Sequence, residues 1–344
     1  MTAVALIVGG GVSVEIVPHV LRIVEASGAH IEWQRVDTPQ LADPSAEDPL
    51  DAAIAAIREC GIGLKTRLYG PPRDTGQTHH QAQTGVSGLG NPNVILRQRL
   101  GLYAGVRPIR ALPGIQTRYP DLDLVLIREN TEDIYKGIEH EIVDGVVESL
   151  KVVTRDACRR ITRFAFDAVV TLGRRHVTFI HKANIMKMSD GLFLRTAREI
   201  ASERPEVGFR EMIVDAACMQ LVLDPFQFDV ILAGNLYGDI LSNLGSGLTG
   251  GISGAYSVNI GNECRVYESI HGDAPHLEGT GLANPLPVLT PAVALLRHVG
   301  EEKSANAIEA SVTAILQREG PRTPDLGGSS STEEMADAIV EGLP

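Results

Sequence analysis

Hydrophobic and polar positions along the chain follow two patterns. Short apolar runs rich in valine and isoleucine are typical of buried strands, whereas apolar residues three and four apart indicate helices that bury one face. The two patterns alternate along the sequence, which predicts an α/β fold. The predicted strands cover residues 4–8, 31–36, 62–65, 122–127, 177–180, 209–214 and 230–233. The predicted helices cover residues 14–27, 50–60, 155–172, 190–204, 216–222, 287–299, 304–317 and 332–341, and two more begin near Asn93 and Asn235.

Residues 138–153, IEHEIVDGVVESLKVV, alternate with a period of two on both sides of Asp144-Gly145. Asp-Gly between two alternating runs is a strong hairpin signal. We predict a long β-hairpin here, suited to project as an arm that clasps a second subunit.

Two glycine-rich stretches need separate interpretations. IVGGGVSV (7–14) follows the first predicted strand, but a dinucleotide-binding fingerprint requires a third glycine where this chain has Val14. We predict a tight strand-to-helix turn instead. The stretch 68–92 is rich in glycine and proline and has no periodicity, and a loop of that length is functional or mobile.

Composition limits the classes of partner. The chain has 344 residues and a net charge of −12, which argues against general binding to nucleic acid or anionic membranes. No apolar run approaches the roughly 20 residues that span a bilayer. Four scattered cysteines without a CxxC motif indicate reduced thiols. The first strand begins at Val4 with no basic segment before it. We expect a cytoplasmic enzyme.

Three arginines are candidate ligands for an anion. Arg97 lies in NVILR, Arg107 lies at the edge of an apolar stretch, and Arg128 ends a predicted buried strand. An arginine at such a position needs a partner. A single one would form a structural ion pair, whereas three around one region are suited to hold a di- or tricarboxylate. The sequence leaves both interpretations open.

Tyr135 and Lys182 are candidate proton-transfer residues. Lys182 follows the run VTFIH, at the carboxyl end of a predicted parallel strand, where α/β proteins place their sites. A buried lysine near a cation can act as a base, and a nearby tyrosine can donate a proton. Each residue alone is more often structural.

Asp215 and Asp239 each come after a predicted buried strand, and Asn243 lies four residues after Asp239, on the same helical face. Cations such as Mg²⁺ prefer one or two carboxylates together with substrate and water oxygens. Alternatively, both aspartates cap helices at strand-to-helix turns. A metal site and a pair of caps are equally compatible with the sequence.

Five motifs, met in order along the chain, change the interpretation. They are RENTEDIY from Arg128, HKANIMKMSDG from His181, NLYGDILSN from Asn235, HGDAP from His271 and LANP from Leu282. Together they resemble the isocitrate/isopropylmalate dehydrogenase family of β-decarboxylating dehydrogenases. Segments 138–157 and 325–328 are most similar to NAD-dependent isocitrate dehydrogenases, and the resemblance covers nearly the whole chain.

The resemblance implies a two-domain fold. We expect a large α/β cofactor-binding domain from residues 1–100 and 255–344, and a smaller α/β domain from residues 101–254. The hairpin at 138–153 would then be the clasp of a homodimer with shared active sites.

The resemblance also assigns the substrate site. Arg97, Arg107 and Arg128 would hold the carboxylates of a small anionic hydroxy acid. Asn91 and Asn93 would lie near its third substituent. Isocitrate enzymes have Ser or Thr where this chain has Asn91, and a polar Asn93 argues against an isopropyl group.

The metal and the proton-transfer residues follow from the same resemblance. Mg²⁺ or Mn²⁺ would be bound by Asp239, Asn243 and Asp215 of the partner subunit. Lys182 of the partner subunit would take the hydroxyl proton, and Tyr135 would protonate C3 after CO₂ has left. The family has aspartate where this chain has Asn243, so we expect weaker metal binding rather than none.

The cofactor site is the least typical part. The adenosine half would lie against the loop that begins HGDAP and against LANP, and the family's GDGIGPE is GGGVSVE here (9–15). His276-Leu277 matches neither the NAD nor the NADP pattern, but 323–328 lacks the Tyr and Arg of NADP enzymes, so NAD is favoured over NADP. The candidate cofactor-binding residues are His271, Gly272, Ala274, Pro275, His276 and Asn284.

The leading interpretation is metal-dependent oxidative decarboxylation of isocitrate, or of a close 3-substituted malate analogue, with hydride transfer to NAD. One alternative is a specialised-pathway dehydrogenase for a phosphonate analogue of isocitrate, because the Asn91 region and the loop before it are altered. Another is a non-catalytic regulatory subunit of a hetero-oligomeric isocitrate dehydrogenase, since such subunits keep the fold and lose site residues. The arginines, the lysine, the tyrosine and both aspartates are all present, which favours catalysis.

Overall fold

The computed structural model describes residues 1–38, 49–68, 91–272, 274–318 and 320–344. The chain folds into two compact units. Unit 1 contains Met1–Tyr69, Arg110–Leu122 and Ser246–Pro344, and unit 2 contains Gly70–Ile109 and Asp123–Gly245. Residues 69–90 of the predicted long loop lie outside the described residues. No helix of the described ranges has the length and hydropathy needed to span a membrane.

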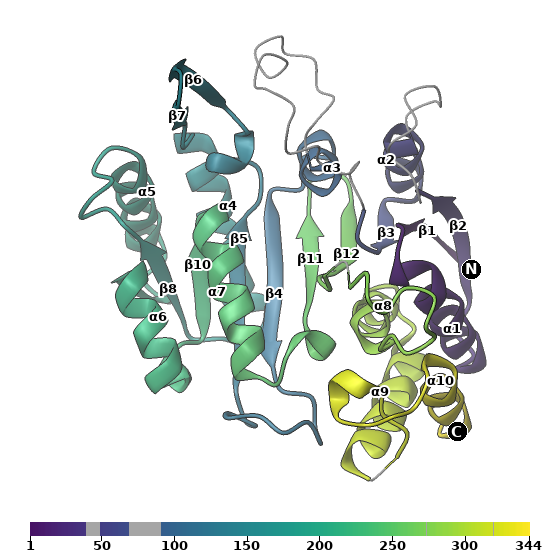
Figure 1. Cartoon of the computed structure of the whole chain (residues 1–344). Coiled ribbons are helices and arrows are strands. Elements are labelled where there is room, and N and C mark those ends of the chain that lie inside the picture. The colour runs from purple at the N-terminus through teal and green to yellow at the C-terminus, as the bar shows by residue number, and fades with distance from the viewer. Residues whose placement is uncertain (39–48, 69–90, 273, 319) are drawn as a thin grey trace. The chain divides into compact units, whose positions relative to one another are not determined.

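Unit 1 contains a mostly parallel sheet with the strand order β2-β1-β3-β12-β11 (Figure 1). β1 pairs in parallel with β2 and β3, β3 pairs in parallel with β12, and β11 runs antiparallel to β12. The strands are β1 (Thr2–Val8), β2 (Ile31–Asp37), β3 (Ile62–Lys65), β11 (Tyr256–Ile260) and β12 (Arg265–Ser269). The helices are α1 (Val12–Ala26), α2 (Pro49–Cys60), α8 (Leu286–His298), α9 (Glu302–Gln317) and α10 (Thr332–Glu341).

The hydrophobic core of unit 1 lies between β1 and a layer formed by α1, α8, α9 and α10. The apolar stripe of α1 is fully buried there, with Ile16, Val20 and Ile23 each at most 2% exposed. α10 begins with a capping box in which Ser331 and Glu334 satisfy each other's backbone amides. Periodicity and capping therefore agree on where these helices form.

The glycine-rich stretch after β1 is a tight turn, as predicted. Gly9 donates its amide to Thr66 Oγ1 at 2.8 Å. A Cβ on Gly9 would lie 1.8 Å from the carbonyl oxygen of Arg67, and Gly11 has a φ of 62°. Glycine is needed here for close backbone approach and for the left-handed conformation.

Unit 2 contains strands in the order β4-β5-β10-β8-β9, in which β10 pairs in parallel with β5 and β8, and β8 pairs in parallel with β9. The strands are β4 (Ala104–Arg110), β5 (Asp123–Glu129), β8 (His176–His181), β9 (Gly208–Ile213) and β10 (Val230–Ala233). The helices are α3 (Pro92–Arg99), α4 (Arg155–Thr171), α5 (Ser189–Glu203), α6 (Val214–Leu223) and α7 (Asn235–Leu248). The carboxyl ends of β5, β8 and β10 therefore lie at one edge of this sheet, which is where parallel sheets carry their sites.

The predicted hairpin is confirmed. β6 (Glu139–Val143) and β7 (Val146–Ser149) pair antiparallel around Asp144-Gly145 and form a sheet of their own, the arm, which stands clear of the other strands of unit 2 (Figure 1). Its apolar residues are exposed, including Ile142 at 52% and Val147 at 52%. Exposed apolar patches of this kind commonly mark interaction surfaces.

All the predicted strands and helices are found, with bounds that shift by a few residues. β4, β11 and β12 were not predicted. α3 belongs to unit 2, although residues 92–99 fall in the predicted large domain. The domain limits at residues 100 and 254 stay a prediction.

Candidate active site

Arg128 is the centre of the site in unit 2. It lies near the carboxyl end of β5 and is 1% exposed. Its Nε donates to Asn235 Oδ1 at 2.9 Å, and its Nη1 lies 2.5 Å from Asp239 Oδ1. α7 can approach this closely because Gly238 has no side chain, as a Cβ there would lie 2.6 Å from Arg128 Cγ. Gly238 in the motif NLYGD is therefore a packing requirement.

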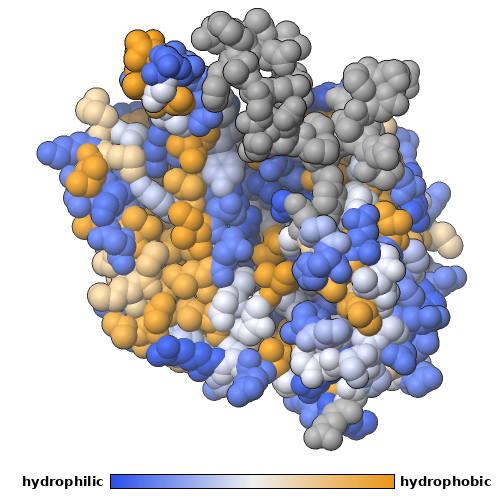
Figure 2. All heavy atoms as spheres, viewed as in Figure 1, coloured by the Kyte–Doolittle hydropathy of each residue, from blue (hydrophilic) through white to orange (hydrophobic). Residues whose placement is uncertain are grey.

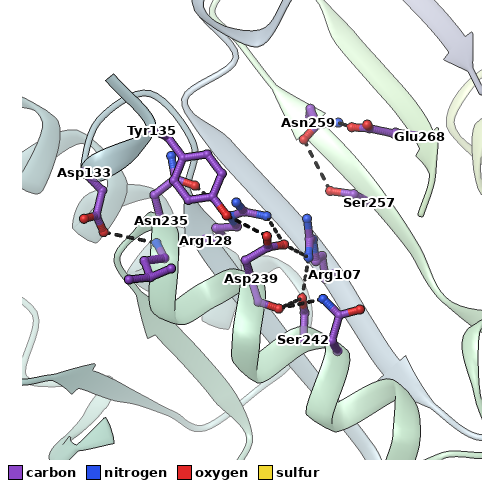
Figure 3. A network of polar contacts seen from close by, with 12 residues as sticks. Arg107, Arg128, Asp133, Tyr135, Asn235, Asp239, Ser242, Ser257, Asn259 and Glu268 are labelled. Atoms are coloured by element: carbon purple, nitrogen blue, oxygen red, sulfur yellow. Dashed lines mark hydrogen bonds and ion pairs between the residues drawn. The ribbon is translucent and has the colours of Figure 1, made fainter. Parts of the chain in front are cut away.

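Asp239 collects three donors (Figure 3). Besides Arg128, Arg107 of β4 brings Nη1 to 3.2 Å from Oδ1, and the Tyr135 hydroxyl donates to Oδ2 at 2.7 Å. Arg107 also donates to the Ser242 hydroxyl, one turn further along α7. Both carboxylate oxygens of Asp239 are thus bound by side chains of the same chain.

The electrostatics of this cluster are dominated by positive charge. Burial, together with the positive charges of Arg107 and Arg97, lowers the pKa of Arg128 to about 9, against the opposing effects of Asp239 and Tyr135. Burial alone would raise the pKa of Asp239, but Arg128 and Arg107 outweigh it and hold the pKa below its ordinary value. Two guanidinium groups contact the carboxylate of Asp239, and Arg97 adds a third positive charge that acts on Arg128, so the cluster is suited to a polyanionic ligand.

Tyr135 lies on a single 3₁₀ turn, Ile134–Lys136, which begins five residues after the end of β5. Its ring lies under the Arg128 guanidinium, with 5.0 Å from Cζ to the ring centroid. Burial raises the pKa of Tyr135, and the hydrogen bond to Asp239 raises it further although Arg128 opposes. The phenol is therefore protonated at neutral pH and is able to donate a proton.

Lys182 and Asp215 form a second, separate pair in unit 2. Lys182 follows β8 and Asp215 lies in the first turn of α6, with 2.5 Å between Nζ and Oδ1. This hydrogen bond lowers the pKa of Asp215. The Lys182 side chain is 27% exposed, not fully buried, and that of Asp215 is 68% exposed. Both groups are available to a molecule that approaches from solvent.

The suggestion that both aspartates cap helices is wrong for Asp239. This residue lies in the second turn of α7, and its carboxylate is bound by Arg107, Arg128 and Tyr135 rather than by backbone amides. β9, which precedes Asp215, is only partly buried, contrary to the sequence-based expectation. Asn243 donates its amide to the carbonyl oxygen of Asp239 at 2.9 Å, so its side chain is fixed on the same face of α7.

Within the described ranges, no three His, Cys, Asp or Glu side chains of one chain come together to hold a metal ion. The oxygen donors that the sequence nominates are carboxylate and amide groups, a set that suits Mg²⁺ or Mn²⁺. Asp239 with Asn243 on α7 supplies part of such a set. Further oxygens must come from substrate, water or another chain.

Asn91 and Asn93 contact each other. Asn91 is the N-cap of α3, and its Oδ1 accepts the backbone amide and the side-chain amide of Asn93, each at 3.0 Å. Asn93 is buried, whereas Asn91 is exposed. The local signal of an asparagine before a helix explains this contact, and the substrate role of the pair stays a prediction.

The candidate cofactor residues all lie in unit 1. His271 is buried and contacts the carbonyl oxygen of Gly272, whereas Gly272, Pro275 and His276 are exposed. Ala274 has a φ of 43°, which is uncommon for a residue other than glycine. The loop that follows is held by Glu15 of α1, which accepts the amides of Gly279 and Gly281.

Asn284 is an anchor within unit 1. Its Nδ2 donates to Ser253 Oγ at 3.0 Å and to Asp325 Oδ2 at 2.8 Å, while its Oδ1 accepts the amide of Leu286 at 2.9 Å. It thereby joins the start of α8 to the segment TPDLGG. The carboxylate of Asp325 therefore lies next to Asn284, where these two segments meet.

The four cysteines carry no sign of catalytic activation. All are free, and burial is the main reason why the pKa of each thiol is raised, to about 12 for Cys158. A reactive thiol needs a lowered pKa. The sequence analysis expected reduced thiols at Cys60, Cys158, Cys218 and Cys264, and all four are free in the structure.

Comparison with known proteins identifies the family. The family model described as isocitrate/isopropylmalate dehydrogenase matches residues 3–339. The chain belongs to the isocitrate/isopropylmalate dehydrogenase family. The crystal structure of isocitrate dehydrogenase from Methylococcus capsulatus is similar over 99% of both chains, with a TM-score of 0.90 and 40% sequence identity. The α/β fold inferred from the sequence resemblance is confirmed.

Two curated relatives of this isocitrate/isopropylmalate dehydrogenase chain carry different roles in their names. An NAD isocitrate dehydrogenase catalytic subunit of Arabidopsis thaliana is 41% identical over 97% of this chain and 87% of its own length. An NAD isocitrate dehydrogenase regulatory subunit of Dictyostelium discoideum is also 41% identical, over 99% of this chain and 91% of its own length. Both relatives are described as mitochondrial, and the cytoplasmic location of this chain stays a prediction.

Sequence reasoning missed the polar residues that support the site. Asn235 orients Arg128, Ser242 binds Arg107, and Asp133 caps the turn that carries Tyr135. Asn235 and Ser242 lie inside the motif NLYGDILSN, so the motif contains the signal. The side chain of Asp133 is buried and its φ is 72°, which no local sequence pattern reveals.

Proposed function

We propose that this chain is the catalytic subunit of an NAD-dependent isocitrate dehydrogenase that requires Mg²⁺ or Mn²⁺. It would oxidise the C2 hydroxyl of isocitrate, or of a close 3-substituted malate, and release the β-carboxylate as CO₂. The observation that carries this proposal is the convergence of Arg107, Arg128 and Tyr135 on Asp239. The catalytic role named for the relative from Arabidopsis thaliana supports it.

The arginine cluster explains the choice of substrate class. Arg128 keeps one nitrogen, Nη2, buried without a hydrogen-bond partner among the described residues. A buried guanidinium N–H without a partner is costly, and a substrate carboxylate would remove that cost. Arg97 and Arg107 add two further positive charges close to Arg128. A tricarboxylate supplies the negative charge that the cluster lacks.

The residues present fit a divalent cation. Asp239 and Asn243 would hold it from α7, and Asp215 of the partner subunit would supply the second carboxylate. When bound, the cation would act as a Lewis acid that stabilises negative charge on the substrate oxygens. Because Asn243 is neutral and its amide nitrogen is bonded to Asp239 O, only its carbonyl oxygen is left to face a cation.

Two residues would move protons. Lys182 of the partner subunit would accept the C2 hydroxyl proton, and NAD, when bound, would supply the hydride acceptor. Loss of CO₂ would leave an enolate, and Tyr135, which the raised pKa keeps protonated, would deliver a proton to C3 to give the ketone. Arg107 and Arg128 hold the substrate's other carboxylates during both steps.

For the cofactor we favour NAD. Gly272, Pro275 and His276, which are exposed, and the loop anchored by Asn284 would bind the adenosine half. Asp325, bound to Asn284, places a negative charge in this cluster, and a carboxylate repels the additional phosphate of NADP. Arg322 donates instead to the backbone carbonyls of Leu316 and Arg318.

Unit 2 carries apolar surface that fits a second copy of the chain. The arm exposes Ile142 and Val147, and a second patch gathers over α6 and α7, where Figure 2 shows apolar side chains side by side. This second patch is formed by Met219, Leu223, Phe226 and Ile240, each at least half exposed. Obligate dimers bury surfaces of this kind. We propose a homodimer, in which Lys182 and Asp215 of the partner subunit complete each site.

The test is formation of reduced nicotinamide by the purified chain with Mg²⁺ or Mn²⁺. NAD and NADP are each offered with isocitrate, homoisocitrate, isopropylmalate, malate, tartrate and a phosphonate analogue of isocitrate. Lys182→Met is the inactive control, and Lys303→Met, on the exposed face of α9, is the matched neutral control. Turnover of isocitrate with NAD is expected.

Two other outcomes have distinct meanings. Turnover of the phosphonate analogue alone would overturn the proposed substrate and favour the specialised pathway. A folded, stable chain that is inert with every substrate, but activates a catalytic relative on mixing, would identify a regulatory subunit.

A further inference from the structure

Lys151 lies at the foot of the arm, two residues after β7, and its side chain is 16% exposed. Its Nζ lies 2.7 Å from Asp190 Oδ1 and 3.6 Å from Asp133 Oδ1. It also lies 4.7 Å from the centroid of the Tyr237 ring. One ammonium group therefore contacts three buried side chains that belong to three different segments of unit 2.

Asp133 connects Lys151 to two parts of the site. Its Oδ1 accepts the amide of Ile134 at 2.9 Å, which starts the turn that carries Tyr135. Its Oδ2 accepts the amide of Leu236 at 3.1 Å, in the first turn of α7, three residues before Asp239. Asp133 holds a φ of 72°, so its position is imposed by these contacts rather than by backbone preference.

Asp190 connects Lys151 to the third part. Its Oδ2 accepts the backbone amide of Lys182 at 2.7 Å, and its carboxylate is hydrogen-bonded to Tyr237 of α7. The side chains of Asp133 and Asp190 are only 2% and 6% exposed. Two carboxylates this buried need a shared counter-charge, and the structure supplies Lys151.

We propose that Lys151 is a positioning residue that sets the mutual placement of Tyr135, Lys182 and Asp239 from the foot of the arm. The inference rests on the proposed function for the roles of those three residues. In a dimer with shared sites, Tyr135 and Asp239 serve one site and Lys182 serves the other. Lys151 thereby couples the two sites. Because it lies at the foot of the arm, a displacement of the arm would move Lys151 before it reached the other residues of the site.

The first experiment measures amide hydrogen exchange in Lys151→Met, which keeps the length of the side chain and removes its charge. Exchange should accelerate by about tenfold or more at the amides of Ile134, Lys182 and Leu236 together, because their acceptors lose the counter-charge. Amides in the middle of α4 should be unchanged. Asp190→Asn should accelerate Lys182 alone and spare Ile134 and Leu236, which remain bound to Asp133.

The second experiment separates positioning from binding. In Lys151→Met the value of kcat for isocitrate should fall by about 100-fold, while KM should change by less than about threefold because the arginines are untouched. Lys151→Arg, which restores the positive charge, should recover much of kcat. Lys303→Met should behave as wild type in both experiments.

Either of two results overturns the inference. One is exchange in Lys151→Met that is unchanged at the three amides or raised uniformly over unit 2. The other is a kcat of Lys151→Met equal to that of the wild type, provided that the wild type is active. If Lys151→Met does not fold, the separate patterns expected for Asp190→Asn and Lys151→Arg decide the question. The exchange pattern needs no turnover, so it stands or falls independently of the proposed function.

Discussion

Arg128 Nη1 lies 2.5 Å from Asp239 Oδ1, and Arg107 Nη1 lies 3.2 Å from the same oxygen. A carboxylate of the protein therefore occupies arginine nitrogens that a substrate carboxylate would use. The same aspartate is the proposed metal ligand. Substrate binding and metal binding both require the contact between Asp239 and the two arginines to break. Binding of either ligand should therefore strengthen binding of the other.

This relationship predicts that the affinity for Mn²⁺ depends on isocitrate. Because Asp239 is held by Arg107 and Arg128, Mn²⁺ alone should bind weakly, and saturating isocitrate should tighten binding by about tenfold or more. Arg107→Gln should bind Mn²⁺ alone more tightly than wild type and show a smaller effect of isocitrate. Titration of Mn²⁺ followed by electron paramagnetic resonance measures both quantities.

The matched control for this titration is Arg110→Gln. Arg110 is the other arginine of β4, and it forms an exposed ion pair with Glu309. This substitution should leave both Mn²⁺ affinities unchanged. Equal Mn²⁺ affinity with and without isocitrate in the wild type would show that Asp239 is not the shared element.

Arg128→Lys should damage substrate binding although it keeps the charge. The planar guanidinium of Arg128 can bind Asn235, Asp239 and a substrate oxygen at the same time, whereas the compact ammonium of lysine cannot reach all three. Losing one charge-assisted hydrogen bond costs about 1.5–3 kcal/mol, so the KM for isocitrate should rise by about 10- to 150-fold. Steady-state kinetics measures this, and Arg22→Lys, in an exposed ion pair with Asp337, is the control.

Much of unit 1 and unit 2 follows from local pattern, but three strands do not. β11 and β12 carry buried polar residues. Asn259 donates to Glu268 (Figure 3), and Glu268 pairs with the fully buried Lys65. A strand whose buried positions are polar lacks the apolar run that reveals it. β4 contains Pro108 and two arginines, so it also lacks the apolar run that reveals a strand. These side chains become interpretable only once their partners, distant in sequence, are known.

The candidate site divides in a similar way. Arg107, Arg128, Tyr135 and Asp239 were nominated from position and motif, and the structure brings all four together. Lys182 pairs with Asp215 instead, and this pair is separate from the cluster around Asp239 within one chain. The sequence contained no signal for Lys151, because one lysine in an alternating hairpin is expected to face solvent. Its role depends on burial against Asp133 and Asp190, which only the tertiary structure shows.

The lowered pKa of Asp239 predicts a specific dependence of stability on pH. A carboxyl group whose pKa is lower in the folded chain stabilises the fold above its unfolded pKa, and this contribution is lost as pH falls through the folded pKa. Relative to Asp239→Asn, the wild type should have a larger free energy of unfolding near neutral pH. The difference should shrink below about pH 4.

Urea titrations at neutral and acid pH measure this difference. Asp121→Asn, at an exposed position outside the site, should follow the wild type at each pH. A difference between wild type and Asp239→Asn that stays constant from neutral to acid pH would contradict the assigned cause.

Tyr135→Phe should lower kcat with little effect on KM. Removing the phenol takes away the proton donor for C3, and a positioned general acid contributes about 10²- to 10⁴-fold. The arginines remain, so ground-state binding is kept. Steady-state kinetics with isocitrate measures both constants. Tyr119→Phe, outside the site, is the control, and an unchanged kcat in Tyr135→Phe would remove Tyr135 from the mechanism.

A charged residue on the arm should separate the two copies of the chain and abolish activity without unfolding. In Ile142→Asp or Val147→Asp, a carboxylate would be buried against the second copy without a counter-charge, which is strongly unfavourable. Both side chains are about half exposed in the single chain, so the fold itself loses little. Light scattering after size exclusion should show a monomer with wild-type circular dichroism.

The activity of that monomer distinguishes shared sites from independent ones. If Lys182 and Asp215 of the partner subunit complete each site, a folded monomer has neither a base nor a second metal carboxylate within reach of Tyr135. Its kcat/KM should therefore fall by about 10³-fold or more. Val170→Asp, at a similarly exposed apolar position on α4, should remain dimeric and active. An active Ile142→Asp monomer would show that one chain holds a complete site.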